Sequence, residues 1–254
     1  MPTPVHTYTQ QVYLNEGAKG SLLQLTVSGV GTESTGSGAA HKQDLATGLW
    51  TRAAANVASI SGGFEGSAVY DPHLNRFYVV QSQFWSNQKL SYIRGSDMTW
   101  VDTPLMPFPP SGANYTRAFA FPERRLMLLH SSASQGGTAG LFALDLNNIA
   151  GGITALTTSG TIPTNQNQWV YHPRAGKFYQ KPAVTGNTLN VLTPPSGTGK
   201  TGTWAFSTVT IAGSGLPSQT FGTAQHYTRL QYVPAIDMLA WIAAGTTQVA
   251  IVKV

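Results

Sequence analysis

The chain has 254 residues, of which 15 are Lys or Arg and 10 are Asp or Glu, against six Trp, ten Tyr and ten Phe. This composition excludes a disordered chain, which needs high net charge and few aromatics, and a helical bundle, which covers its surface with charged residues. The absence of Cys excludes disulfide scaffolds and thiolate metal sites. The net charge is +5, but the basic residues are scattered and form no run that would indicate nucleic-acid binding.

The N-terminal segment is predicted to supply a strand and no targeting signal. Residues 1–6 contain neither a basic n-region nor an apolar h-region, so we expect synthesis in the cytoplasm without a signal peptide. Residues 5–8 alternate in the manner of a β-strand. No apolar stretch approaches the ~20 residues of a membrane helix, so we predict no membrane span.

A recurring phrase predicts a β-hairpin about every 51 residues. An aromatic residue is followed by Pro, a few turn residues and an apolar run. The phrase begins at Tyr70, Phe121, Tyr171 and Tyr232, and a weaker copy begins at Tyr13. Because Pro lacks a backbone donor and presets φ for a turn, it ends the first strand, and the apolar run is the partner strand.

Two further strands are predicted after each hairpin. The third strands are residues 90–93, 141–144, 189–192 and 249–252. A tryptophan after a turn marks the fourth strand at Trp50, Trp100 and Trp204, and Ile153 occupies the matching place in the third copy. Two markers with one period indicate a repeated unit of about four antiparallel strands.

Such a repeat predicts an all-β fold, a β-propeller of five blades. The predicted single domain spans residues 1–254, with blades at 10–58, 60–110, 112–160, 163–213 and 224–254. The last unit ends after its third strand, so we expect the N-terminal strand to close the ring by pairing of the termini. A three-stranded last blade and a β-sandwich are the alternatives.

The order of hairpin, third strand, polar turn and Trp resembles the Kelch-type and galactose-oxidase-like propellers. The resemblance covers nearly the whole chain and implies the fold without a function. Kelch blades carry a Gly-Gly doublet after the second strand, and only residues 136–137 lie near that place.

The first strand of each blade lines the channel of a propeller, so the residues before each leading aromatic are predicted to form its mouth. The candidate ligand-binding residues are Tyr8, Glu65, Tyr115, Arg117, Gln166, Asn167, His226 and Tyr227. Such a lining can hydrogen-bond and stack a sugar or a similar polar ligand. The alternative is that these groups satisfy one another and ordered water.

No catalytic residue, metal site or cofactor is predicted. Glycosidases need paired carboxylates, and only Glu65 maps to the mouth, while most other acids fall in predicted turns. His6 and His226 could meet where the termini pair, and a structural pair is favoured over a metal pair. Residues 194–201 resemble a phosphate-binding loop, but Pro194 replaces its first Gly and a strand follows, so we predict an inter-strand loop.

The composition resembles that of bacteriophage virion proteins. Low charge and neutral polar loops suit contacts with glycans or other protein subunits. We therefore expect a non-enzymatic binding or structural module, a virion accessory protein of the fibre, decoration or receptor-binding type. Its predicted partners are other virion or scaffold proteins and glycan, and it is expected in the virion or otherwise in the cytoplasm. The alternatives are a carbohydrate-active hydrolase or lectin that uses the mouth around Glu65, and a bacterial scaffold for protein partners.

Overall fold

The computed structural model describes residues 11–14, 19–26, 39–52, 67–81, 89–97, 99–102, 117–131, 139–164, 168–182, 186–213, 230–242 and 249–254. These residues form twenty β-strands and two short 3-10 helices, η1 (Pro122–Arg124) and η3 (Ile149–Gly151). The predicted all-β class is therefore confirmed.

The strands form five sheets, numbered in chain order. Sheet 1 contains β1 (Gln11–Leu14), β2 (Ser21–Thr26), β3 (Ala39–Asp44) and β4 (Trp50–Arg52), and sheet 2 contains β5 (Ser67–Asp71), β6 (Arg76–Gln81), β7 (Lys89–Arg94) and β8 (Trp100–Asp102). Sheet 3 contains β9 (Arg117–Phe121), β10 (Leu126–Ser131), β11 (Gly140–Asp145) and β12 (Ile153–Ala155). Sheet 4 contains β13 (Thr157–Ser159), β14 (Val170–His172), β15 (Lys177–Gln180), β16 (Thr188–Thr193) and β17 (Thr203–Thr210), and sheet 5 contains β18 (Leu230–Val233), β19 (Met238–Ile242) and β20 (Val249–Val252).

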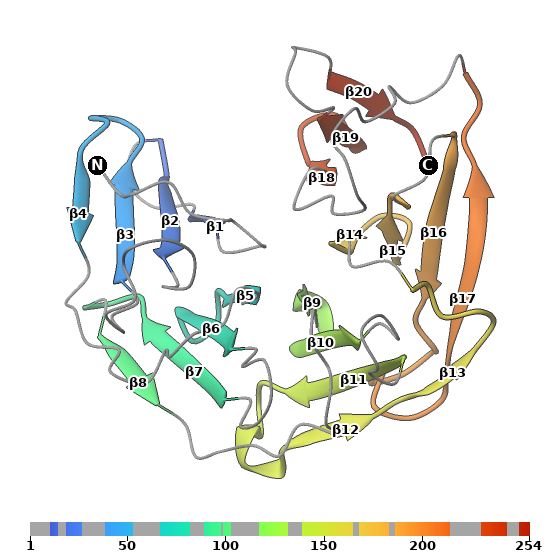
Figure 1. The fold of residues 1–254 in the computed structure, drawn as a ribbon, viewed down its shortest axis with the longest axis horizontal. Helices are drawn as coiled ribbons and strands as arrows, with labels where there is room; N and C mark the ends of the chain where they lie inside the picture. The colour runs from blue at the N-terminus through green and yellow to red at the C-terminus, as the bar shows by residue number, and fades with distance from the viewer. Residues whose placement is uncertain are drawn as a thin grey trace.

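The five sheets follow one another along an arc (Figure 1). The first strands β1, β5, β9, β14 and β18 lie toward its centre, and β4, β8, β12 and β17 lie at its periphery. Each first strand contacts the first strand of the next sheet. Sheets 1 and 5 lie on the two sides of an opening in the arc.

The first hairpin of sheets 2 to 5 is built as the repeated phrase predicts. The prolines Pro72, Pro122, Pro173 and Pro234 each directly follow the first strand. The turn ends in a residue with positive φ, which is Asn75, Arg125, Gly176 or Asp237. A left-handed residue lets the chain reverse within four residues, so second strands pair antiparallel with the first.

Sheet 4 departs from the prediction of four antiparallel strands per unit. Residues 157–159 belong to the predicted third blade, yet they form β13, which pairs parallel with β17 of sheet 4. The Leu156 N–H still donates to the Leu141 carbonyl of sheet 3, at 2.9 Å, and the chain then crosses to the next outer edge. At Gly160, φ is +77° and a Cβ would collide with the Phe206 carbonyl, so the crossing strand ends at a glycine.

Sheet 5 has three strands among the described residues. Its outermost strand β20 pairs with β19, and the N-terminal segment that was predicted to pair with it, residues 1–10, lies outside the described residues. The predicted closure by pairing of the termini is therefore left as a prediction.

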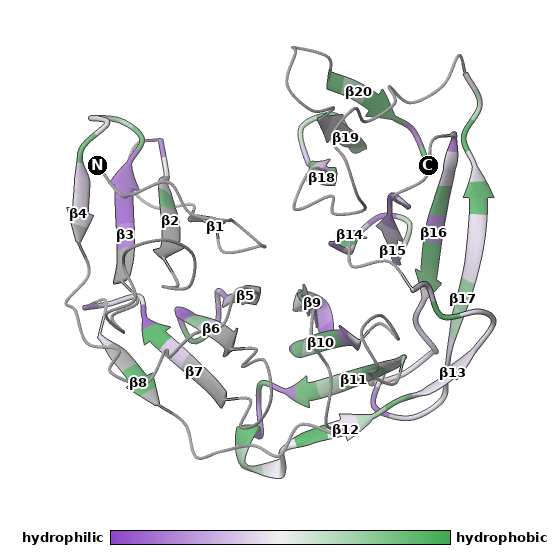
Figure 2. Ribbon diagram, viewed as in Figure 1, coloured by the Kyte–Doolittle hydropathy of each residue, from purple (hydrophilic) through white to green (hydrophobic). Residues whose placement is uncertain are grey.

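Apolar side chains fill the spaces between neighbouring sheets. Figure 2 shows hydrophobic residues along β10, β11 and β16. In β10 every residue is buried, because Leu126 and Leu128 pack toward sheet 4 while Met127 and Leu129 pack toward sheet 2. Tyr179, Leu189 and Val191 of sheet 4 pack with Leu230 and Trp241 of sheet 5. Full burial of one such side chain contributes about 1.5–3 kcal/mol.

The sheets have two ends with different connections. The turn face is the end that carries the first hairpin turns, residues 72–75, 122–125, 173–176 and 234–237. The loop face is the opposite end, where β9 begins at Arg117 and β10 ends at Ser131.

Candidate functional site

Buried polar side chains gather at the loop face of sheets 3 and 4. Arg117 and His130 of sheet 3 are at most 1% exposed, and Gln180 and Asn190 of sheet 4 are also buried. Burial of polar groups costs free energy unless they find hydrogen-bond partners. A concentration of such groups is therefore unusual, and we take this end of the interface as the candidate site.

Arg117 is the described member of the predicted mouth. The other predicted residues, Tyr8, Glu65, Tyr115, Gln166, Asn167, His226 and Tyr227, lie outside the described residues. Arg117 is the first residue of β9 and pairs across the ladder with His130. Since side chains alternate along a strand, Arg117 lies on the same sheet face as Phe119, which packs against sheet 4. Arg117 therefore points into the interface of sheets 3 and 4.

His130 lies beside Arg117 on that face and is held uncharged. The indole N–H of Trp169 donates to His130 Nδ1 at 3.2 Å, so in the neutral ring Nε2 carries the proton. Burial, opposed by a backbone hydrogen bond with Pro163 and assisted by the Arg117 charge, lowers the pKa of His130 to about 4. The imidazole is thus a neutral bridge between β10 and the segment that enters β14.

Three side-chain amides complete the polar end of the interface. Asn190 Nδ2 donates to Gln180 Oε1 at 2.8 Å across β15 and β16. Gln168 Nε2 donates to the Ala118 carbonyl of β9 at 3.1 Å, which ties the start of β14 to sheet 3. Gln180 shares a strand face with Phe178, which packs in the core of sheets 3 and 4. The amides therefore line the same interface as Arg117 and His130.

Lys181 belongs to a different interface. It follows Gln180 directly, so it lies on the face of Tyr179, which packs toward sheet 5. Lys181 is buried, its Nζ donates to the Pro182 carbonyl at 3.4 Å, and burial lowers the pKa of its ammonium group. Its charge is separated from Arg117 by the thickness of sheet 4, so Lys181 is not part of the candidate site.

Three carboxylates at the turn face bind cationic side chains of a neighbouring sheet. Asp71 accepts from Arg125 of sheet 3 at 3.0 Å, and Asp237 of sheet 5 accepts from Arg174 of sheet 4 at 3.0 Å. Asp145 of sheet 3 pairs with Lys200 of sheet 4. From the sequence, acids in the turns are expected to be solvated or to cap turns. The structure adds that Asp71 is only 2% exposed and that all three acids join neighbouring sheets.

The loop predicted at residues 194–201 connects β16 to β17 and lies against sheet 3. Arg124 Nη1 donates to the Pro195 carbonyl at 2.7 Å, and Trp204 Nε1 donates to the Gly199 carbonyl at 2.9 Å. No helix follows the loop, since β17 begins at Thr203. The inter-strand loop is confirmed, and these contacts show that it helps to join sheets 3 and 4.

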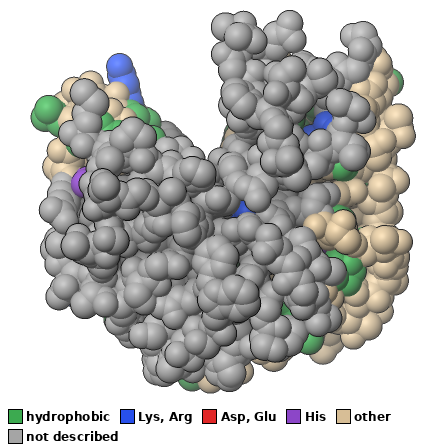
Figure 3. All heavy atoms as spheres, in the orientation of Figure 1, with side chains coloured by type: hydrophobic (Ala, Val, Ile, Leu, Met, Phe, Trp, Pro, Cys, Tyr) green, Lys and Arg blue, Asp and Glu red, His purple; other side chains and the backbone are tan. Residues whose placement is uncertain are grey.

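The chemistry available at the candidate site is that of a cation with neutral donors. Arg117 can stabilise negative charge, and the amides and aromatic rings can position a polar ligand. The described part of the chain contains no group of three or more His, Asp or Glu that could hold a metal ion. In the space-filling view, Lys or Arg atoms are visible near the centre of the molecule (Figure 3). The sequence gives no local signal for the role of His130, because its hydrogen-bond partner Trp169 is 39 positions away.

No family model matches the chain, and no curated protein sequence matches it. Solved structures share its fold. One is a protein from Bacteroides uniformis proposed to be a 6-phosphogluconolactonase, with a TM-score of 0.53 and 13% identity over 88% of this chain and 61% of that chain. Another is YjhT, with a TM-score of 0.53 and 11% identity over 92% of this chain and 71% of that chain. This chain spans about three fifths of the first structure's length, and at these identities the likeness shows the fold alone.

These structures correct the functional prediction made from composition. A non-enzymatic virion accessory module was expected, whereas the similar structures include a proposed lactonase, so that expectation is not kept. In this chain, scarce charge and neutral loops accompany short strands and tight turns, so they indicate the strand-rich fold and do not identify a function. In the described residues no helix is long and apolar enough to cross a membrane.

Proposed function

We propose that the chain is an enzyme of the β-propeller type that opens the ring of a small, negatively charged sugar lactone at the loop face of sheets 3 and 4. The observation that carries the proposal is Arg117, a guanidinium buried at the first residue of an innermost strand, beside an imidazole held neutral. The substrate class is suggested by the proposed lactonase among the similar structures.

The propeller assignment rests on the arrangement of the sheets. Five consecutive sheets follow an arc with their first strands toward its centre, and each first strand contacts the next (Figure 1). We propose five blades whose ring is closed by the N-terminal strand. A cysteine pair introduced at Val5 and Ile251 should form a disulfide under mild oxidation, and failure of every pair across residues 4–8 would argue against closure by this segment.

The reaction that we assign to the site is addition of water to the lactone carbonyl carbon, followed by cleavage of the bond between that carbon and the ring oxygen. One proton of the added water ends on the former ring oxygen, so the product is an open-chain hydroxy acid. Arg117 donates hydrogen bonds to the carbonyl oxygen, which becomes an oxyanion, and a buried donor stabilises that charge more strongly than an exposed one. His130 stays uncharged and accepts a hydrogen bond from Trp169, so it fixes the position of that indole ring.

The test is proton release at constant pH with 6-phosphogluconolactone and with the unphosphorylated gluconolactone, each compared with spontaneous hydrolysis. We expect the wild-type chain to accelerate hydrolysis of the phosphorylated lactone. Arg117→Lys should lose about tenfold in kcat, because a single ammonium group does not reproduce the fixed fork of guanidinium donors. The matched control is Arg94→Met, because Arg94 is half-exposed in a local pair with Asp97. Background rates with both lactones, or an unaffected Arg117→Lys variant of native strand content, would refute the proposal.

A further inference from the structure

A pocket lies at the turn face between sheets 3 and 4. It has a volume of about 160 Å³ and lies between the β11–β12 connection and the β16–β17 loop. Its lining includes Leu126, Ala143, Asp145, Asn148, Thr154 and Lys200. The candidate catalytic site is at the opposite end of the same two sheets, so this pocket has no part in the proposed reaction.

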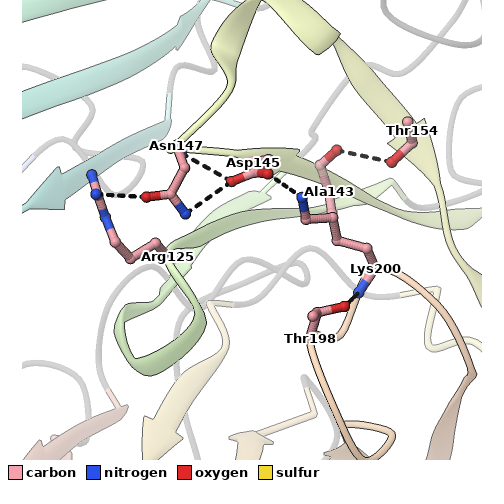
Figure 4. A network of polar contacts seen from close by, with 7 residues as sticks. All are labelled: Arg125, Ala143, Asp145, Asn147, Thr154, Thr198 and Lys200. Carbon is pink, nitrogen blue, oxygen red and sulfur yellow. Dashed lines mark hydrogen bonds and ion pairs between the residues drawn. The ribbon is translucent and has the colours of Figure 1, made fainter.

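The rim of the pocket carries one negative and one positive group that come from different sheets. Asp145 ends β11, and Lys200 belongs to the loop before β17 (Figure 4). They form an ion pair, and the side chains are 14% and 49% exposed, respectively. Burial alone would raise the pKa of Asp145, but hydrogen bonds from Lys200 and the Asn147 backbone lower it, so the carboxylate is charged at neutral pH.

The carboxylate is held in place independently of Lys200. Asp145 Oδ1 accepts from the Asn147 backbone N–H at 2.9 Å and from Asn147 Nδ2 at 3.2 Å. Asn147 in turn accepts from Arg125 Nη1 at 2.6 Å (Figure 4). Arg125 also donates to Asp71 of sheet 2. Because these hydrogen bonds fix Asp145, the ammonium group of Lys200 can move aside while the carboxylate stays at the rim of the pocket.

The floor of the pocket is apolar and small. Leu126 and Ala143 are buried beneath the rim. The Thr154 hydroxyl donates a hydrogen bond to the Ala143 carbonyl at 3.4 Å. A protein cavity of about 150 Å³ holds one benzene, which has six heavy atoms. The volume thus selects a ligand of about six heavy atoms with a small aliphatic group.

We propose that this pocket binds a small zwitterion, an α-amino acid of the size of alanine. Its ammonium group binds Asp145, its carboxylate binds Lys200, and its methyl group contacts Leu126 and Ala143. A zwitterion replaces one partly exposed ion pair by two, whereas a singly charged ligand leaves one protein charge without a partner. Separation of the existing pair costs little, because partly exposed pairs are weak.

Isothermal titration calorimetry on the full chain tests the proposal with L-alanine, and with acetate and methylammonium as the two half-ligands. We expect saturable binding of L-alanine, at least tenfold weaker binding of L-phenylalanine, and no saturation by either half-ligand at the same concentration. Asp145→Asn and Lys200→Met should each weaken L-alanine binding at least tenfold.

The matched control is Arg174→Met, which removes an ion pair at the turn face between sheets 4 and 5 and does not line the pocket. It should bind L-alanine as the wild type does. Lys200 is half-exposed in a loop, so Lys200→Met keeps the test valid if Asp145→Asn fails to fold. Lack of binding to the wild type, equal binding of a half-ligand, or unchanged binding by Lys200→Met would overturn the proposal.

Discussion

At the turn face, sheets 3 and 4 are joined by a partly exposed ion pair, whereas at the loop face the same sheets bury a guanidinium, a neutral imidazole and side-chain amides. Asp145 and Lys200 keep contact with solvent, which makes their attraction weak but their burial inexpensive. Arg117 and His130 have lost that contact, so each depends on its protein surroundings. The two ends of one interface thus differ in how strongly their polar side chains depend on protein partners.

A cavity in the core between the two faces should weaken both. Trp204 is fully buried, packs against Phe121 and Phe178, and donates to the Gly199 carbonyl. Trp204→Ala should lower the free energy of unfolding by about 3–5 kcal/mol, the usual cost of removing a buried Trp. Urea unfolding measures the change, with Trp204→Phe expected to lose less. A loss below about 1 kcal/mol would show that the two sheets do not unfold as one unit.

Acid should act on the loop face at a higher pH than on the turn face. The pKa of His130 falls from 6.5 to about 4 on folding, so between these values the unfolded chain binds a proton that the folded chain does not. The free energy of unfolding should therefore fall by up to about 3 kcal/mol as pH drops from 6.5 to 4, and His130 adds no further loss below pH 4. His130→Gln should remove this component, and His73→Gln, at an exposed position, should retain it. Equal pH profiles for all three proteins would contradict the assignment.

The buried acid of the turn face should contribute more than the exposed ones. Asp71 is nearly inaccessible and accepts from Arg125 and from the His73 backbone N–H. Asp71→Asn should cost about 1–3 kcal/mol, because a hydrogen bond to a charged partner is lost in a buried place. The control is Asp97→Asn, whose pair with Arg94 is half-exposed on both sides and should matter less. A larger effect at Asp97 than at Asp71 would reverse the role assigned to burial.

The smallest effect is expected at the ion pair of sheets 3 and 4. Lys200→Met should change the free energy of unfolding by at most about 1 kcal/mol, and the difference from wild type should shrink in 1 M salt. The lowered pKa of Asp145 means that its contribution is complete above the unfolded value of 3.8 and is lost as pH falls below it. Chemical denaturation at two salt concentrations measures this, and a salt-independent loss would point to packing instead of charge.

Much of the strand pattern was predictable because its causes are local. Pro72, Pro122, Pro173 and Pro234 end first strands through their missing N–H group, and the apolar runs that follow can only be buried partners. Trp50 and Trp100 begin the outer strands as expected. The crossing of β13 to sheet 4 was not predictable, since parallel pairing of residues 157–159 with residues 203–205 depends on how two sheets pack.

The candidate site was predictable only in part for a similar reason. By itself the sequence determined a repeated all-β architecture and placed Arg117 at the start of a first strand, because both follow from local turn chemistry and strand periodicity. Only the tertiary structure decided that His130 meets Trp169, that Asp71 and Asp145 bind cations of neighbouring sheets, and that Lys181 faces away from Arg117. Burial and electrostatics act across space, so a side chain's charge and partner are set by the sheet packed against it and not by its neighbours in the chain.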